Sequence, residues 1–338
     1  DTYVTAPMST DYDLYSLKLN VDLGWAELTS ISSYQERFAQ LATDVSGQLP
    51  GSGTRLSWVY GQETTSFTQE LRLSGEAGDN LFWTAGLFYK DFESEADSFT
   101  DREGPIDPFY AFVLEFLGFD TSQQYLEGGG EGNTEVKAIF GEVNYLFTDN
   151  FDVTLGVRYF EDERESTGSF ASFGVGFPSM GEVDNDSTVF RLVAKYRFNN
   201  DLMMYASASE GFRSGGTQFV ATALLGIPEV FDPEELTTYE LGAKGTIMDG
   251  RFIFETALYR TDYEDIIVYT PNPFGVQAFL NGGVVEGVGF VFGGQFFATE
   301  DLFFKVTYGN TDSSYQQDTL THRKGEPCLL YTSDAADE

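Results

Sequence analysis

The residues that could perform chemistry are few and do not group into a site. The chain has one histidine, His322, and one cysteine, Cys328, which is too little for a nucleophile–histidine pair or a zinc centre. Carboxylates are abundant, but no pair has a spacing that requires general acid–base catalysis. No glycine-rich phosphate loop follows a strand and opens a helix. The sequence therefore predicts no enzyme, no metal site and no cofactor.

The charge balance excludes a further class of function. There are 54 acidic and 19 basic residues, so the formal net charge is 19 − 54 = −35. Nucleic-acid binding needs a surplus of positive charge on one face, and this composition cannot provide it. Aromatic residues make up 16% of the chain, which is too many for a disordered protein. No run approaches about 18 consecutive apolar residues, so no membrane-spanning helix is expected.

The elements that position these side chains follow a period of two. In one segment Phe151, Val153 and Leu155 alternate with Asp152 and Thr154, which is the pattern of a strand with one apolar face. About twelve such strands are predicted, and most exceed the usual ~5–6 residues. Their predicted ranges are 12–22, 26–40, 66–74, 81–92, 135–147, 151–163, 188–198, 202–212, 236–247, 251–266, 284–297 and 302–313.

Short and long connections alternate strictly between these strands. The long ones are 41–65, 93–134, 164–187, 213–235 and 267–283. In antiparallel hairpins this alternation places all short turns at one end and all long loops at the other, as in an outer-membrane barrel. We therefore predict an all-β fold, namely a transmembrane antiparallel β-barrel that is incomplete, with about twelve strands of a larger barrel. A soluble β-protein is the alternative.

The polar strand faces would line the lumen and the apolar faces would contact lipid. The predicted inner charges are Arg72, Arg158, Arg191, Lys195, Arg197, Lys244 and Lys305, together with Glu70, Glu142, Asp152, Glu240 and Glu255. Buried charges require partners, so lateral salt bridges along the wall are expected. A second hypothesis is that cations near the outer rim, Arg158 and Arg213, bind an anionic ligand.

The loop 93–134 combines strong acidity with a short helix signal. It carries ten acidic residues and one basic residue, Arg102. Within it, Asp107 is a predicted N-cap, Pro108 the first helical residue and Gly118 the C-terminal stop. An apolar helix face should bury against something. The helix is predicted to fold over the barrel mouth and to contact ligand; packing against neighbouring loops is the alternative. The contact residues would be Phe109, Tyr110 and Phe112.

Several strings resemble the barrel of TonB-dependent outer-membrane receptors. They are LTSISSYQERF from Leu28, TQELRLSG from Thr68, WTAGLFYKDFE from Trp83, IFGEVNYLFTDNFDVTLGVRYFEDERE from Ile139, YASASEGFRSGG from Tyr205 and FDPEELTTYELGAKGTIMDGRFIFETALYRTDYEDI from Phe231. The resemblance implies active import of a scarce solute, with a ferric siderophore as the expected cargo. It also implies a plug domain that the TonB complex pulls with the energy of the proton gradient, and a place in the outer membrane of a Gram-negative bacterium.

The sequence departs from the family pattern in ways that predict a fragment. It has no plug or TonB-contacting segment, and a plugged barrel has about 22 strands. A motif that usually carries lumenal Glu has Val291 and Gly293 at those places. We expect residues 1–316 to be part of a receptor barrel and 317–338 to be a loop remnant with a non-native tail. Within that tail, 327–338 resembles translated sequencing-adapter sequence, which would remove any role for Cys328.

Two rival functions stay open at this point. One is a passive porin-like channel, and the other is a soluble, secreted β-rich binding protein. The partners expected of a receptor are outer-membrane lipid, lipopolysaccharide, the TonB complex through the missing plug, and a siderophore or another small solute. Divalent cations bridging the acidic loops to lipopolysaccharide phosphates would explain the acidity. Nucleic acid is not an expected partner.

Overall fold

A computed structural model describes seven stretches of the chain. These are residues 8–44, 55–103, 106–123, 126–218, 228–271, 277–319 and 323–328. His322 and residues 329–338 lie outside the described residues, so only the first two positions of the predicted tail 327–338 are described.

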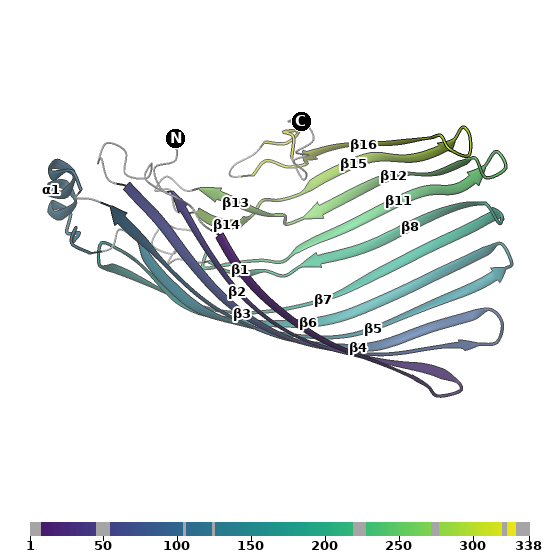
Figure 1. Cartoon of the computed structure of the whole chain (residues 1–338), viewed down its shortest axis with the longest axis horizontal. Coiled ribbons are helices and arrows are strands. Elements are labelled where there is room, and N and C mark those ends of the chain that lie inside the picture. Colours follow the sequence, from purple (N-terminus) through teal and green to yellow (C-terminus); the bar gives the residue numbers. More distant parts are fainter. Residues whose placement is uncertain are drawn as a thin grey trace.

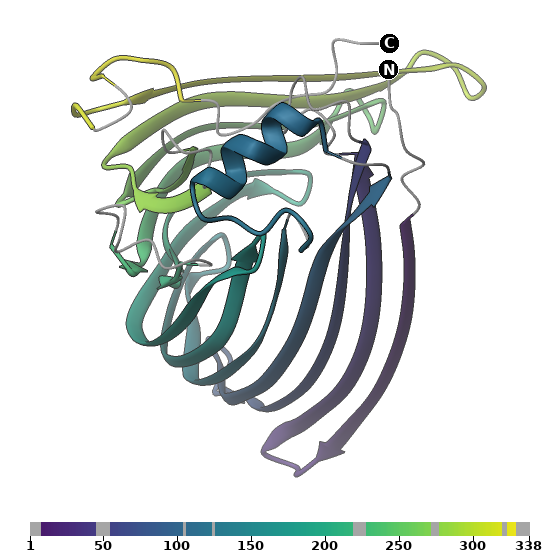
Figure 2. The ribbon, with the colours of Figure 1, turned by 90° about the vertical axis from the view of Figure 1, so that its left-hand side faces the viewer.

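Twelve strands form one antiparallel sheet in which chain neighbours are also spatial neighbours (Figure 1). They are β1 (Met8–Asp22), β2 (Ala26–Asp44), β3 (Arg55–Ala77), β4 (Leu81–Glu103), β5 (Glu127–Thr148), β6 (Phe151–Ser172), β7 (Val175–Asn199), β8 (Leu202–Arg213), β11 (Glu234–Ile247), β12 (Phe252–Glu264), β15 (Val285–Phe297) and β16 (Phe303–Tyr315). The predicted strand number and antiparallel order are confirmed. The sheet curves into an open trough, and β1 and β16 do not pair with each other (Figure 2).

The connections between these strands sort to the two ends of the trough, as the alternation predicted. The short-turn end lies to the right in Figure 1, and the long-loop end lies to the left with helix α1 (Pro108–Phe116). Two small sheets also belong to the long loops. One pairs β9 (Gly216–Thr217) with β10 (Val230–Phe231), and the other pairs β13 (Ile267–Pro271) with β14 (Gln277–Asn281).

Several strands extend further toward the long-loop end than the sequence predicted. The segment 164–187 was predicted to be a loop, which is wrong: β6 and β7 pair continuously up to Ser172 and Val175. The reversal between them uses Phe173 (φ 46°) and Gly174 (φ 78°), the two left-handed residues of a tight hairpin turn. Beyond the outward apolar band, polar and small residues occupy most positions of these strands, so the hydrophobic alternation that marks the other strands is weak there.

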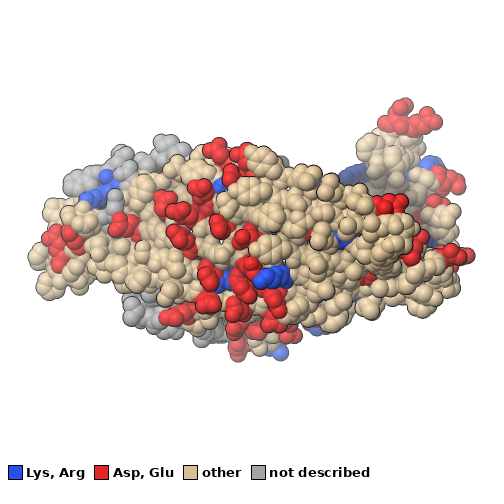
Figure 3. All heavy atoms as spheres, turned by 90° about the horizontal axis from the view of Figure 1, so that it is seen from below, with Lys and Arg blue, Asp and Glu red and all other residues tan. Residues whose placement is uncertain are grey.

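The two faces of the sheet carry opposite kinds of side chain. On β6 the outward row has Leu155, Val157 and Tyr159 exposed, and this apolar band starts at the short turns. Above it the outward rows become acidic, which Figure 3 shows as a red belt across the middle of the outer face. One row of cross-strand neighbours in this belt is Asp91, Glu135, Glu163 and Asp184. Among strand residues with described side chains, the outward-facing cations are Lys137 and Arg260.

The inner face is crowded because side chains converge on the concave side of a curved sheet. Short inner residues are therefore covered by longer neighbours, as for Asp152 and Ala257, which are 2% and 6% exposed. Three inner aromatic rings lie over a glycine directly opposite on the next strand. These pairs are Phe140 over Gly86, Tyr205 over Gly242 and Tyr259 over Gly289. A Cβ at these glycines would come within 2.4 Å of the ring.

Helix α1 forms as the sequence predicted. The Asp107 carboxylate accepts hydrogen bonds from the N–H groups of Phe109 and Tyr110, and Gly118 ends the helix with φ 92°. Figure 2, which looks onto the long-loop end, shows α1 lying across the opening of the trough. The expectation that its apolar face is buried is wrong, because no helix residue is buried. Over the described residues, no helix has the length and apolar character needed to cross a bilayer.

Candidate functional site

The inner wall carries the lateral ion pairs that the sequence predicted. Arg191 on β7 pairs with Glu142 on β5 at 3.2 Å, and Lys244 on β11 pairs with Glu255 on β12 at 3.5 Å. In each pair both side chains point toward the lumen, because every second residue of a strand lies on the inner face. Arg72 and Glu70 pair along one strand. The wall therefore compensates much of its own charge.

Arg158 is an inner-wall cation held by aromatic rings. Its guanidinium carbon lies 5.3 Å from the centre of the Phe88 ring and 5.9 Å from that of Phe140. Among the described residues it forms no ion pair with a carboxylate within 4.0 Å. Cation–π contacts orient a guanidinium but leave its N–H donors available. Arg158 therefore presents a positive, hydrogen-bonding group to the lumen. Along β6 it lies at the level of the outward-facing Tyr159, where the apolar band ends.

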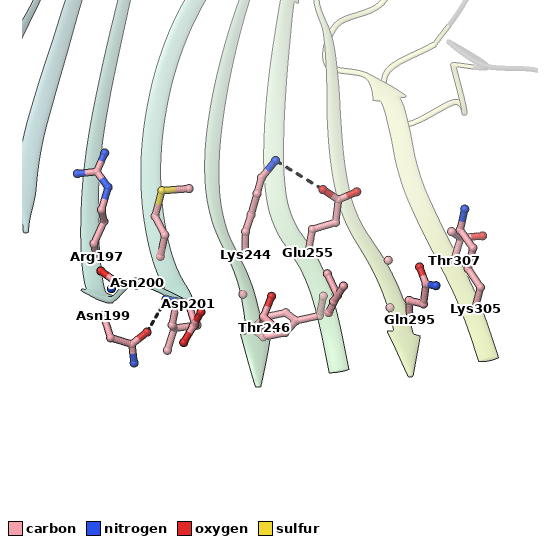
Figure 4. A pocket seen from close by; sticks show the side chains of 17 residues that line it. Arg197, Asn199, Asn200, Asp201, Lys244, Thr246, Glu255, Gln295, Lys305 and Thr307 are labelled. Atoms are coloured by element: carbon pink, nitrogen blue, oxygen red, sulfur yellow. Dashed lines mark hydrogen bonds and ion pairs between the residues drawn. The ribbon is translucent and has the colours of Figure 1, made fainter. Parts of the chain in front are cut away.

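A recess of about 590 Å³ lies on the inner wall at the short-turn end (Figure 4). Arg197, Lys244 and Lys305 line it together with Gly293 and Gly294, and the absent side chain of the inward-facing Gly293 leaves space in it. Arg197 is engaged with the buried Asp152 carboxylate at 2.7 Å. In Figure 4 the Lys244 ammonium points toward Glu255, while Lys305 stands apart on β16. This end of the wall thus concentrates basic side chains in a chain that is strongly acidic overall.

Arg213 lies at the end of β8, toward the long loops. Its guanidinium donates to the Glu234 carboxylate at 2.7 Å and to the Ile267 carbonyl at 3.3 Å. The same carboxylate accepts the Ile267 N–H at 2.7 Å. The Arg213 side chain is nevertheless 58% exposed. Arg213 therefore ties β8 and β11 to the start of β13 and still offers N–H donors to the mouth.

The segment that follows β8 folds back across the inner wall, and we call residues 214–218 the strap. Its anchor is Asp162, which is 3% exposed. The Asp162 carboxylate accepts hydrogen bonds from Arg164, from Ser214 at 2.8 Å and from Asn185 at 3.2 Å. Burial raises the pKa of Asp162, but these hydrogen bonds and the Arg164 charge outweigh it and hold the pKa below its ordinary value. Asp162 is therefore an ionised carboxylate that accepts hydrogen bonds from three surrounding side chains.

Further polar contacts join the strap to the next long loop. The Gln218 side chain donates to the Phe279 carbonyl at 2.6 Å and accepts the Phe279 N–H at 3.0 Å. The Asn281 amide donates to the carbonyls of Asp232 and Asp265, both at 2.9 Å. The Phe231 and Phe279 rings are 5.2 Å apart. The loops after β8 and after β12 are thus connected at the mouth.

The three predicted helix residues lie apart from the predicted arginines. Phe109 and Phe112 are 72% and 66% exposed at the outer tip of the long-loop end, and Tyr110 is half-buried. Arg158 is on the inner wall and Arg213 at the loop base. Sequence reasoning missed Asp162, because nothing distinguishes it from its many acidic neighbours except inward parity on β6. That parity, next to a local arginine at Arg164, is the signal that could have found it.

The comparisons with known proteins agree with this architecture. The family described as TonB dependent receptor-like, beta-barrel, matches residues 2–327. The pesticin receptor of Yersinia enterocolitica serotype O:8 is 27% identical over 165 residues, which are 49% of this chain and 24% of that protein. The rhizobactin receptor of Rhizobium meliloti (strain 1021) is 25% identical over 242 residues, which are 62% of this chain and 31% of that protein.

Solved structures show the same fold. The ferric yersiniabactin uptake receptor FyuA from Yersinia pestis has a TM-score of 0.75 at 19% identity, covering 95% of this chain and 46% of that one. The siderophore receptor PiuA from Acinetobacter baumannii has a TM-score of 0.67 at 16% identity, covering 95% and 49%. The chain spans less than half of each of these relatives. Because the family match covers nearly all of this sequence, the protein belongs to the TonB-dependent receptor β-barrel family of Gram-negative outer membranes.

Proposed function

We propose that this barrel is part of an outer-membrane receptor that imports a ferric siderophore. The observation that carries the proposal is the family match over residues 2–327, in a chain whose inner wall carries paired charges and the cation Arg158, and whose outer face is apolar and then acidic. Relatives named for siderophores support the cargo class, including the ferric yersiniabactin uptake receptor and the rhizobactin receptor. A metal chelate with carboxylate or phenolate oxygens is the kind of solute that arginines such as Arg158 and Arg213 attract.

The proposed binding residues would contact different parts of the solute. Arg158 would donate hydrogen bonds to anionic oxygens while Phe88 and Phe140 hold its guanidinium in place. Arg213 would add a second cation from the loop base, using the donors that its pair with Glu234 leaves exposed. The α1 rings of Phe109, Tyr110 and Phe112 would contact apolar parts of the solute at the mouth.

Active coupling is the part of the proposal that separates a receptor from a porin. In a receptor, the TonB complex would act on a plug domain and use the proton gradient, and chemistry by the barrel itself is not required. Lipid would contact the apolar band, and lipopolysaccharide would face the acidic belt, with divalent cations bridging its phosphates to the carboxylates. Within this chain, residues 1–316 would form the barrel, and residues 317–338 would be a loop remnant with a non-native tail.

Uptake of radioactive iron tests this function. The complete receptor would be expressed in a strain that lacks its own siderophore receptors, and ferric yersiniabactin and ferric rhizobactin would be supplied. Saturable uptake that an uncoupler of the proton gradient abolishes is the expected result. Arg158→Gln should raise the KM for uptake by at least about tenfold, since a hydrogen bond to a charged group is worth about 1.5–3 kcal/mol and about 1.4 kcal/mol is a factor of ten. Lys137→Gln, on the outer face, is the control.

Two results would contradict the proposal. Uptake that is linear with concentration and insensitive to the uncoupler would identify a passive channel instead. An unchanged KM in Arg158→Gln, with saturable coupled uptake intact, would remove Arg158 from the binding site while leaving the transport function in place.

A further inference from the structure

The strap leaves the barrel wall where two neighbouring strands part. Pairing between β7 and β8 reaches Arg191 and Ser209, whereas β8 and β11 stay paired up to Arg213 and Glu234. At the point of parting, the Glu210 carboxylate accepts the Phe190 N–H at 2.9 Å, which replaces a lost strand contact. The chain beyond β8 is therefore no longer paired with β7 as a neighbouring strand, and it turns onto the inner face of the wall.

The strap is seated on that face by close contacts that only small residues permit. The hydroxyls of Ser166 on β6 and Thr217 in the strap are 2.8 Å apart. A Cβ on Gly181 of β7 would lie 2.2 Å from the Thr217 side chain, and a Cβ on Gly215 would lie 2.3 Å from the Phe231 carbonyl oxygen. Together with the bond from Ser214 to Asp162, these contacts fix the strap at both ends of its short length.

The strap is also continuous with the neighbouring loop. Through Gln218 it exchanges two hydrogen bonds with Phe279 in β14. Its strand β9 also pairs with β10, and the next residue after β10, Asp232, exchanges hydrogen bonds with the Asn281 side chain at the end of β14. Any movement of the strap away from β6 therefore carries the β13–β14 hairpin with it, unless these bonds break.

We propose that Asp162 is a positioning residue: it pins the strap and the β13–β14 hairpin, as one body, against the inner wall and so sets the width of the mouth. The functional meaning of this inference rests on the proposed transport function, because the width of the mouth matters only if a solute passes through it. Asp162 itself is beneath the strap, 3% exposed, and does not contact the solute. Loss of its carboxylate would release Ser214 and leave Asn185 and Arg164 without their shared acceptor.

Disulfide formation tests the seated position without any ligand. The complete receptor, in detergent, would carry Ser166→Cys and Thr217→Cys in a background from which any other cysteine has been removed. Because the two native hydroxyls lie 2.8 Å apart, the new thiols should cross-link rapidly under mild oxidation. A pair that does not cross-link in this background would overturn the seated position, whatever the behaviour of any Asp162 variant.

Hydrogen exchange tests the pinning and the single body. Asp162→Ala should raise the deuterium uptake rate of residues 214–218 and 277–281 together, at least tenfold, and should slow the disulfide by a similar factor. Glu163→Ala is the matched control, since it removes the next carboxylate along β6, which points outward. Unchanged exchange in Asp162→Ala, or equal effects of both variants, would refute the pinning. Faster exchange in the strap alone would refute the single body.

These outcomes are independent of transport. A receptor that cross-links and responds to Asp162→Ala but imports no ferric siderophore would disprove the proposed function and leave the positioning role of Asp162 intact. Normal coupled uptake in a receptor whose strap does not respond to Asp162→Ala would do the reverse.

Discussion

Replacing Gly86 by alanine should destabilise the barrel, although alanine is usually the better residue for an ordered backbone. An ideal Cβ at Gly86 lies 2.3 Å from Cζ of Phe140 and 2.8 Å from the Leu71 carbonyl oxygen. Carbon atoms pack at about 3.5–4.0 Å, so the ring must retreat by more than about 1 Å and the neighbouring strand must also give. Overpacking of this kind costs about 1–3 kcal/mol.

Gly141 provides the matched control on the next strand. It faces outward, and the nearest atom to its ideal Cβ is the Thr84 carbonyl oxygen at 3.6 Å, an ordinary contact. Gly141→Ala should therefore be neutral or stabilising by about 0.4–1 kcal/mol, because it restricts the unfolded chain. The assay is urea unfolding of the complete receptor refolded into lipid vesicles, followed by tryptophan fluorescence.

A double variant makes the reasoning sharper. In Gly86→Ala with Phe140→Ala, the clash with the ring is removed, so the extra cost of Gly86→Ala should fall to the small share due to the Leu71 carbonyl. Equal midpoints for Gly86→Ala and Gly141→Ala, or a Gly86→Ala cost that survives in the double variant, would refute the claim that the ring occupies the place of a side chain.

Other consequences follow from the charges. Because the pKa of Asp162 is lowered in the folded protein, its ionised carboxylate stabilises the seated strap at any pH above the ordinary carboxyl pKa, and this stabilisation is lost as the pH falls toward the folded pKa. The hydrogen-exchange rate of the strap amides, corrected for the intrinsic pH dependence of exchange, should therefore be constant from pH 7 to about 5 and rise below about 4. Arg158→Lys should weaken solute uptake nearly as much as Arg158→Gln, since an ammonium lacks the planar fork that stacks on rings; a KM equal to wild type would argue against stacking. Asp152→Asn should cost about 1–3 kcal/mol in the same urea assay, because Arg197 and Lys195 lose their carboxylate, and an unchanged midpoint would contradict this.

The sequence was sufficient for the twelve strands and their two faces, since alternation is imposed locally by what each side chain meets. The apolar Leu155 and the acidic Asp152 indicate the lipid-facing and lumen-facing sides of their own strand, and this assignment does not depend on how the other strands are arranged. The α1 cap was predictable for the same reason, because Asp107, Pro108 and Gly118 act within a few residues of one another. These predictions depend on short-range physics.

The outer half of the molecule was less predictable for a physical reason. Beyond the apolar band, the β6–β7 hairpin carries polar and small residues at most positions of both faces, so its hydrophobic period is weak. The strap depends on contacts between distant positions, such as Ser214 and Asp162, which are 52 residues apart. Serine and aspartate are ordinary loop residues, and nothing in their neighbourhood announces such a partner.

The glycine–aromatic pairs of the inner wall also decide what a travelling molecule touches. Each ring fills the space of an absent side chain on the adjacent strand, so the clearance at Phe140, Tyr205 and Tyr259 is set largely by the main chain. Two of these rings carry a cation above them, from Arg158 and Lys244. For the proposed siderophore cargo, we expect a flat aromatic chelator group to meet rings and positive charge along one route, and planar, electron-rich cargo to be favoured over bulky aliphatic cargo.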